Sequence, residues 1–342
     1  MTDKNSKTES QKLIDRVDRL PECCTPFLLE TGTERALSTR NRYAYELEKF
    51  FEWLILNHPD FCVYDSIKNI PTSLLSHVSS QDISRYVSLY KDDDHKERSA
   101  ALKRNTLSSF FEYYVNNRLL EYNPVKASAK VKIHASDDVI YLNIEEQNRF
   151  LEAVRTGDCL PTRSKKVHDR LWQRDVAIVS LMLDTGMRVS ELCGINIMDV
   201  NFEECSMIIT RKGGKNQTLY FSDDTRDKIE GYLRERRILD PTLDLSEPLF
   251  KSRKGGRLTT NGVWRMVTKY AESALPGKGN LISPHKLRSS FAMELYRAKG
   301  DILLIQRTLG HKSVSTTNIY AKATNTEMKE ARNILANIRN SV

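Results

Sequence analysis

The chain lacks the features that mark exported and membrane proteins. Its opening segment, MTDKNSKTESQKLIDR, has no apolar run of signal-peptide length, and no later segment is apolar for long enough to span a bilayer. Internal repeats and low-complexity tracts are also absent. We therefore expect a cytoplasmic protein with no membrane partner.

Cysteine is sparse, and its spacing does not suggest a metal. The six cysteines form no CxxC pair and show no zinc-like spacing with histidines, and we find no acidic metal-binding cluster. We expect reduced, mostly buried thiols, with no metal site and no cofactor. The cysteines are Cys23, Cys24, Cys62, Cys159, Cys193 and Cys205.

Length and charge set broad limits. The 342 residues, 39% of them hydrophobic, suffice for two domains. The 53 Lys and Arg residues exceed the 45 Asp and Glu residues and give a formal charge of +8. This modest excess favours an anionic partner such as nucleic acid, but it is also common in ordinary basic cytosolic proteins.

Composition and periodicity divide the chain into five segments. A polar start, a Pro-terminated helical region and a Lys-, Ser- and Ala-rich stretch precede a second folded region. We expect a flexible N-terminal extension (1–28) with a short helix near 13–20, a helical domain (29–125), a linker (126–141), a second domain (142–325) and an amphipathic C-terminal helix (326–342).

The first domain is expected to be entirely helical. Apolar and aromatic residues recur at helical spacing in 38–58, where Ser38 is a plausible N-cap, and in 80–91 and 96–120. Polar residues separate these segments. Three helices can therefore form one compact domain.

The second domain changes from helical to strand periodicity and back. Helical patterns cover 143–157 and 173–186, the latter ending at Gly186. The β-rich runs CSMIIT and QTLYFS flank RKGGKN, which predicts a hairpin. Helical patterns then resume. The expected fold class is mainly α with a small β-sheet in the second domain.

The segment LDTGMRVSEL contains the first candidate functional residue. Arg188 follows the glycine stop and lies three residues before Glu191, so the carboxylate can hold the guanidinium while other donors reach a ligand. A structural surface pair is the competing interpretation.

Lys212 is the second candidate, in the turn of the expected hairpin, where an ammonium can reach a phosphate oxygen and donate a proton. Lys215 competes for that role. A turn lysine is usually just solvated.

A third candidate site lies at a helix start. Ser283 and Pro284 form a helix-opening signal, and His285 and Arg288 lie one turn apart on one face. Free N–H groups and the helix dipole favour an anion there. A structural core histidine is the alternative interpretation.

A fourth candidate site follows Gly310. His311 comes directly after this glycine, and Tyr320 comes nine residues later in a Ser/Thr-rich segment. A lone tyrosine most often packs as an amphipathic aromatic.

Together these motifs resemble the tyrosine recombinase (phage integrase) family, and Xer-type enzymes most closely. TGMRVSEL, SPHKLR, LGH and STTNIY occur in the family's order, with the hairpin lysine between the first two. The resemblance covers about residues 142–325. It implies a two-domain DNA clamp, in which a helical SAM-like core-binding domain precedes the catalytic domain.

The resemblance also implies a mechanism. A tyrosine attacks a DNA phosphodiester to form a 3'-phosphotyrosyl intermediate, arginines hold the phosphate, a lysine protonates the leaving oxygen, and histidines assist. The carried-over catalytic residues are Arg188, Lys212, His285, Arg288, His311 and Tyr320, with Glu191 orienting Arg188 or a neighbouring histidine, and with no metal.

The implied partner is double-stranded DNA carrying recombination sites. A homotetramer would form through exchange of the C-terminal helix, and accessory DNA-bending or directionality proteins would fit the family. The basic, aromatic-rich stretches 40–45 and 96–104 are candidates for groove contacts by the first domain.

Three departures from the Xer pattern favour integration or excision of a mobile element. They are the longer N-terminal extension, the basic stretch 162–170 and Ser289, where Xer enzymes usually have histidine. The alternatives are Xer-type chromosome or plasmid dimer resolution, a type IB topoisomerase, and a non-catalytic DNA-binding regulator on the same fold.

Overall fold

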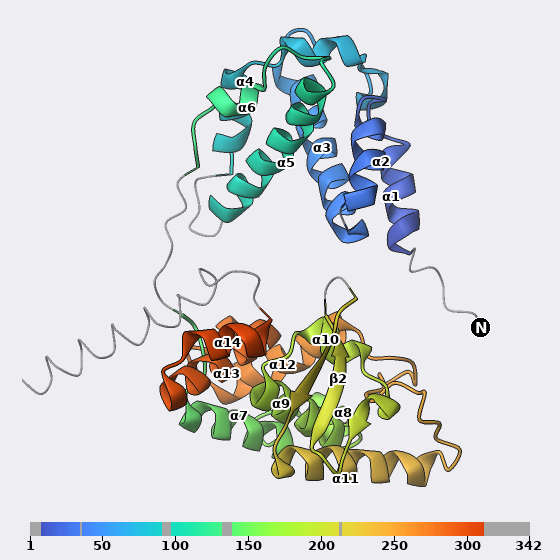
Figure 1. The fold of residues 1–342 in the computed structure, drawn as a ribbon, viewed down its shortest axis with the longest axis vertical. Coiled ribbons are helices and arrows are strands. Elements are labelled where there is room, and N and C mark those ends of the chain that lie inside the picture. Colours follow the sequence, from blue (N-terminus) through green and yellow to red (C-terminus); the bar gives the residue numbers. More distant parts are fainter. Residues whose placement is uncertain (1–7, 35, 91–96, 132–138, 212–213, 311–342) are drawn as a thin grey trace, which may run out of the picture. The chain divides into compact units, whose positions relative to one another are not determined.

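The computed structural model describes residues 8–34, 36–90, 97–131, 139–211 and 214–310 (Figure 1). The chain divides into two compact units, 1–135 and 136–342. The described residues are mostly helical, with one three-stranded sheet in the second unit, which confirms the expected fold class. None of the helices described is long and apolar enough to cross a membrane.

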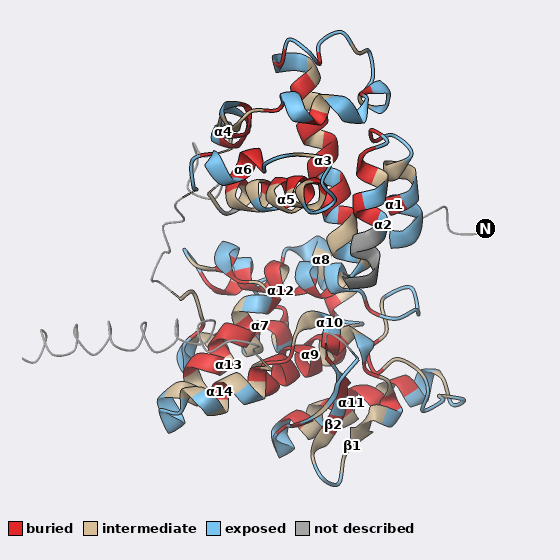
Figure 2. Cartoon of the chain, turned by 45° about the horizontal axis from the view of Figure 1, so that its top comes forward, coloured by how far each residue is buried: buried red, intermediate tan, exposed pale blue. Residues whose placement is uncertain are grey.

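The first unit is helical. Its core joins aromatic side chains of the third and fifth helices, including Phe50, Phe51, Phe110 and Phe111, all fully buried. The elements are α1 (Glu9–Val17), α2 (Cys24–Glu34), α3 (Leu37–Asn57), the 3-10 turns Ile67–Asn69 and Thr72–His77, α4 (Ser80–Ser88), α5 (Glu97–Asn116) and α6 (Pro124–Ala127). Figure 2 shows the buried residues that run along α3.

Residues 8–28 of the expected flexible extension (1–28) are folded, and residues 1–7 lie outside the described part. The Thr8 hydroxyl caps α1 by accepting from the Gln11 amide. Leu13 and Phe27 are buried in the core of the first unit. The apolar residues of this polar segment are too few to form a clear periodic pattern, and packing against α3 orders them.

Two smaller expectations are also corrected. Helix α3 begins at Leu37 with Ala36 in the N-cap position and no side-chain cap, so Ser38 is not the cap. All six cysteines are free, but most are not buried: Cys23 and Cys24 are buried, whereas the other four are exposed or partly exposed. The expected linker 126–141 begins within α6, and its residues 132–138 lie outside the described part.

The second unit is built around one central helix. Helix α9 packs against α7, α11 and α13, and most of its residues are buried (Figure 2). The elements are α7 (Ile144–Thr156), α8 (Thr162–His168), α9 (Trp172–Thr185), α10 (Val189–Gly194), the 3-10 turn Ile197–Asp199, β1 (Val200–Asn201), β2 (Ser206–Thr210), β3 (Asn216–Tyr220), α11 (Asp223–Leu239), α12 (Thr260–Ala274), the 3-10 turn Gly279–Leu281, α13 (Pro284–Lys299) and α14 (Ile302–Leu309).

The sheet confirms the predicted hairpin. Its strands are antiparallel in the order β1-β2-β3, and Thr210 pairs with Asn216 beside the turn. Met207 and Ile209 of β2 and Leu219 of β3 are buried, and their neighbours are more exposed. This alternation places one face of the sheet on the core.

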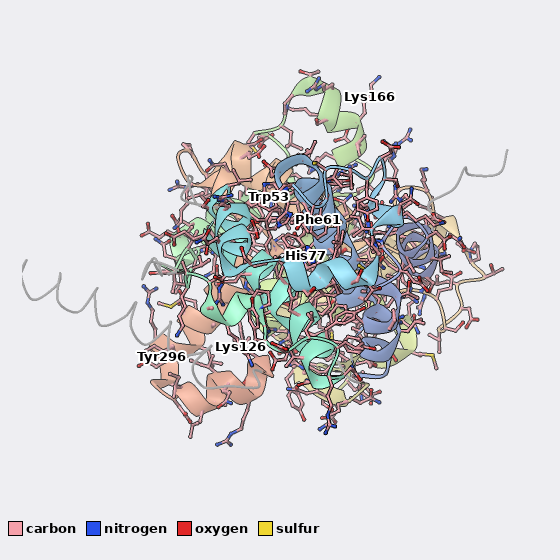
Figure 3. All side chains as sticks on the ribbon, turned by 90° about the horizontal axis from the view of Figure 1, so that it is seen from above. Trp53, Phe61, His77, Lys126, Lys166 and Tyr296 are labelled. Atoms are coloured by element: carbon pink, nitrogen blue, oxygen red, sulfur yellow. The ribbon has the colours of Figure 1, made fainter. Side chains whose placement is uncertain are left out.

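The basic stretch 162–170 forms α8 and the turn after it. Its last helical residue, His168, is buried and lies 3.0 Å from the Tyr270 hydroxyl, which donates to Asp175 at 3.1 Å. Lys165 and Lys166 are exposed, and Lys166 extends from α8 away from the body of the unit (Figure 3). A buried polar network therefore anchors a solvent-facing basic helix.

Candidate active site

Arg188 lies where one helix ends and the next begins. Gly186 closes α9 in the left-handed conformation, with φ of 61°, and Arg188 takes the N-cap position of α10. The Glu191 carboxylate accepts from the Arg188 backbone amide at 2.7 Å and from its Nη1 at 2.8 Å. The Arg188 side chain remains 38% exposed, so it can contact a ligand. The predicted Arg188–Glu191 contact is therefore present.

Arg288 is buried in the first turns of α13, with 2% of its surface exposed. Its Nη1 donates to the Gly186 carbonyl at 2.6 Å, and its Nη2 donates to the Leu309 carbonyl at 2.5 Å. Both acceptors lie at the ends of helices, where carbonyls lack helical partners and the helix dipole is negative. Two helix ends thus compensate the buried charge.

Arg211 is a site residue that the sequence analysis missed. It follows β2 directly and is 9% exposed. Its guanidinium contacts Glu191 and the carbonyls at the end of α14, and it therefore lies in the same cluster as Arg188 and Arg288. The only signal was an arginine next to a glycine turn, which is weak because turn cations are usually solvated.

His285 lies beside this arginine cluster in the first turn of α13, where part of the residue is exposed to solvent while neighbouring groups crowd its ring. Loss of hydration, followed by the positive charges of Arg288, Lys286 and Arg188, lowers the pKa of His285. The ring is therefore neutral near pH 7 and able to accept a proton. Ser289, one of the departures from the Xer pattern, is buried and donates to the His285 backbone carbonyl at 3.2 Å.

Three of the predicted catalytic residues, Lys212, His311 and Tyr320, lie outside the described residues. The residues that precede two of them are described. Arg211, before Lys212, and Gly310, before His311, approach each other closely, because a Cβ at Gly310 would lie 3.0 Å from the Arg211 Cζ.

The cluster is suited to binding an anion. The guanidinium groups of Arg188 and Arg211 contact the Glu191 carboxylate, Arg288 shares the Leu309 carbonyl with Arg211, and His285 lies near Arg188 and Arg288. Guanidinium groups match the oxygens of a phosphate, and they stabilise charge that develops on it. Across the described ranges no group of His, Cys, Asp or Glu side chains could hold a metal ion.

Only some basic and aromatic residues of the candidate DNA-contacting stretches 40–45 and 96–104 are exposed. Lys103 is buried and pairs with Glu46 at 2.5 Å, and Arg104 donates to a backbone carbonyl of α6 at 2.7 Å. Both cations are therefore engaged by groups of the first unit itself. Arg42 and Tyr45 of α3 are exposed.

Residues 141–327 match the protein-family model described as the phage integrase family. A tyrosine recombinase XerC of Thermodesulfovibrio yellowstonii is 31% identical over 301 residues, which cover 86% of this chain and 90% of that protein. A tyrosine recombinase XerS of Streptococcus mutans is 28% identical over 93% of this chain and 98% of its own length.

Solved structures show the same likeness. The XerH site-specific recombinase bound to palindromic difH substrate, a post-cleavage complex, matches with a TM-score of 0.67 and 25% identity, over 96% of this chain and 85% of that one. A lambda integrase dimer bound to a COC' core site matches with a TM-score of 0.61 and 20% identity, over 86% of this chain and 95% of that one, which shows a shared fold.

Proposed function

The chain belongs to the phage integrase family and is a site-specific DNA recombinase of the tyrosine type, and we propose that Tyr320 is its nucleophile. One observation carries this assignment of residues. Arg188 and Arg288, from motifs far apart in the sequence, both direct donors to the end of α14, the helix that leads into the LGH and STTNIY motifs.

In the proposed step the Tyr320 hydroxyl oxygen attacks a DNA phosphorus, and the bond from phosphorus to the 5'-oxygen breaks. The products are a 3'-phosphotyrosyl enzyme and a free 5'-hydroxyl. Attack by a second 5'-hydroxyl reverses the chemistry and joins new strands. Because the covalent intermediate conserves the bond energy, religation needs no ATP.

The surrounding residues act on charge and protons. Arg188 and Arg288 bind the non-bridging oxygens, where negative charge grows in the transition state. Neutral His285 accepts the Tyr320 proton, a role that its lowered pKa supports. Lys212 protonates the departing 5'-oxygen, His311 donates to a phosphate oxygen, and Glu191 orients Arg188. No metal or cofactor takes part in this scheme.

DNA is the partner of this recombinase, and its affinity should come mainly from phosphate contacts. We assign groove contacts in the first unit to Arg42 and Tyr45, because both are exposed. Binding that does not weaken as salt is added would contradict a phosphate-dominated interface. We also propose that this activity takes place in the cytoplasm.

We further propose a homotetramer on two DNA sites, assembled by exchange of the segment 326–342, which the sequence predicts to be a helix. The amphipathic pattern of this segment, which lies outside the described residues, supports the proposal. A chain truncated after Thr324 should still cleave nicked DNA but fail to form a two-site complex. Normal synapsis by the truncated chain would rule out the exchange.

For the biological role we propose integration or excision of a mobile element, on the strength of the basic stretch 162–170 and Ser289. Xer-type dimer resolution is the second candidate, favoured by the near full-length likeness to XerC and XerS proteins. Deleting the gene distinguishes the two roles: accumulated chromosome or plasmid dimers indicate resolution, and loss of a circular excised element indicates mobility.

The decisive experiment tests the chemistry. Purified protein is mixed with nicked DNA that carries the sequence flanking its coding region, and a denaturant-resistant protein–DNA adduct is sought for wild type and Tyr320→Phe. An adduct that disappears in the variant supports the proposal. An adduct in both identifies a different nucleophile, and tight DNA binding without an adduct favours a non-catalytic regulator. Plasmid relaxation without strand exchange would indicate a topoisomerase.

A further inference from the structure

We propose that Arg211 is a positioning residue, which ties the β2–β3 hairpin to the C-terminal end of α14 and so aligns the general acid with the bound phosphate. The inference rests on the proposed function, in particular on the role of Lys212. It concerns a residue that does not itself touch DNA.

The Arg211 guanidinium joins three parts of the second unit. Its Nη1 donates to the Leu309 carbonyl at 2.6 Å and its Nη2 donates to the Thr308 carbonyl at 2.8 Å, both at the end of α14. Its Nε donates to Gln217 Oε1 in β3 at 2.7 Å. Its Nη1 also lies 3.3 Å from Glu191 Oε1 in α10.

These contacts distinguish Arg211 from Arg188, the exposed arginine of the cluster. A guanidinium has five N–H donors, and four of those of Arg211 are directed at protein acceptors. The group is also buried, in contrast to Arg188, whose side chain is 38% exposed. With four of its donors already bound to the protein, Arg211 is assigned a role on the protein and not on the phosphate.

The backbone of Arg211 closes the base of the hairpin loop. Its amide donates to the Lys215 carbonyl at 2.8 Å, and its own carbonyl accepts from the Gly214 amide at 3.0 Å. The chain therefore leaves β2 toward Lys212 from a residue that is held on both its backbone and its side chain.

The C-terminal end of α14, which Arg211 contacts, has a defined geometry. Gly310 closes α14 in the left-handed conformation, with φ of 63°, and lies against the Arg211 guanidinium. The last carbonyls of a helix lack helical partners and carry negative partial charge, so a cation is favoured there. The Leu309 carbonyl accepts hydrogen bonds from both Arg211 and Arg288. Arg211 is therefore connected through one carbonyl to Arg288, which is proposed to bind the phosphate.

Lysine cannot replace this geometry. A single ammonium is a point charge, whereas the planar fork of Arg211 reaches two carbonyls, an amide oxygen and a carboxylate at once. Small misplacements of a catalytic group cost about a hundredfold in rate. We therefore expect Arg211→Lys to lower the rate of adduct formation by about a hundredfold.

The test separates positioning of the general acid from general loss of structure. Adduct formation is timed on nicked DNA with the ordinary 5'-oxygen and on DNA with sulfur at that bridging position. The phosphorus–sulfur bond breaks without a proton donor, because a thiol has a pKa of about 8.5, far below that of an alcohol. The sulfur substrate should restore most of the lost rate in Arg211→Lys and in Lys212→Ala, but not in Tyr320→Phe.

Arg236→Lys is the matched control. Arg236 is also a buried arginine that donates to two carbonyls, those of Pro248 and Leu249, and to the Glu247 carboxylate. It belongs to α11, and among the described residues its hydrogen bonds go to the segment 247–249 and not to Arg188, Glu191, Arg211, His285 or Arg288. Arg236→Lys should keep the wild-type rate on the ordinary substrate at temperatures where it is folded.

If Arg211→Lys does not fold, Gln217→Ala provides a milder test, because it removes one contact to Arg211. It should slow the oxygen substrate and be rescued by sulfur. Two outcomes would overturn this inference alone. In the first, wild type forms the adduct and the Arg211 variant forms it at the same rate as Arg236→Lys. In the second, the sulfur substrate rescues Lys212→Ala but not the Arg211 variant. Absence of any wild-type adduct would overturn the proposed function and this inference with it.

Discussion

The Nη2 of Arg288 donates a hydrogen bond to the backbone carbonyl of Leu309 at 2.5 Å. This contact joins the start of α13 to the end of α14. It is supported by packing between the same two helices, where Met293 and Ile305 are fully buried. The Arg288 guanidinium and the end of α14, where the LGH motif begins, are therefore held in a fixed position relative to each other.

Arg288→Lys tests the forked contact. The lysine keeps the charge but cannot span the Gly186 and Leu309 carbonyls, so adduct formation should fall by roughly 10²- to 10³-fold. The free energy of unfolding should also fall by about 1–3 kcal/mol, because a buried carbonyl loses its donor. Single-turnover kinetics and urea unfolding measure the two effects. Arg297→Lys, on the partly exposed side of α13, is the control and should react at the wild-type rate.

His285 gives a pH prediction. Its lowered pKa means that the folded protein binds a proton less readily than the unfolded chain does. Stability should therefore be fully present above the unfolded value of about 6.5 and decline as the pH falls through the lower, folded value. NMR titration of the ring and urea unfolding of wild type and His285→Gln measure this. A ring midpoint at or above the unfolded value would contradict the prediction.

Gly186→Ala should destabilise the second unit by about 2–5 kcal/mol, because left-handed backbone strain adds to a steric clash. The new Cβ would lie 2.2 Å from the Phe291 ring. Gly300→Ala is a matched control: this glycine has a similar φ, 65° against 61°, and nothing within 4 Å of the added atom. It should cost only the strain, about 1–2 kcal/mol. Equal losses in urea unfolding would show that Phe291 moves aside freely.

The buried pair of Lys103 and Glu46 predicts a non-additive effect in the first unit. Glu46→Ala alone should destabilise by about 3–5 kcal/mol, because it leaves an unpaired buried ammonium. Combining Lys103→Met with Glu46→Leu should recover most of that loss. The more exposed pair of Lys126 and Glu112 is the comparison and should contribute about 0–1 kcal/mol. Additive losses in urea unfolding would count against the buried pair.

Metal removal gives the last prediction. Adduct formation should continue unchanged in excess chelator, because the scheme uses guanidinium, imidazole and ammonium groups where other enzymes use divalent ions. The measurement is the adduct rate with and without chelator, on protein treated to remove bound metal. A rate that collapses and returns with added Mg²⁺ would contradict the scheme.

Much of the fold follows from local patterns. Gly186 ends α9 as its position after an apolar helix predicts, and Pro284 opens α13. The hairpin lies where the β-rich runs flank a glycine turn. These features depend on backbone conformations of a few neighbouring residues, which the side chains there largely determine.

Other features could not be predicted from the sequence, because they depend on residues that are distant along the chain. Lys103 belongs to a basic, aromatic-rich stretch like those that contact DNA, but it lies inside the first unit because Glu46 of α3 faces it. The N-terminal helices are ordered because α3 offers an apolar surface to Leu13 and Phe27. Neither partner can be inferred from local spacing.

The sequence by itself determined the family, the order of the motifs and the residue types available for phosphate chemistry, because these are properties of short segments. Only the tertiary structure decided that Arg211 belongs with Arg288 and Glu191, that both arginines meet at Leu309, and that the pKa of His285 is lowered. The physical reason is that hydrogen bonds and desolvation depend on which groups lie nearby in space, and packing of α13 and α14 brings these together.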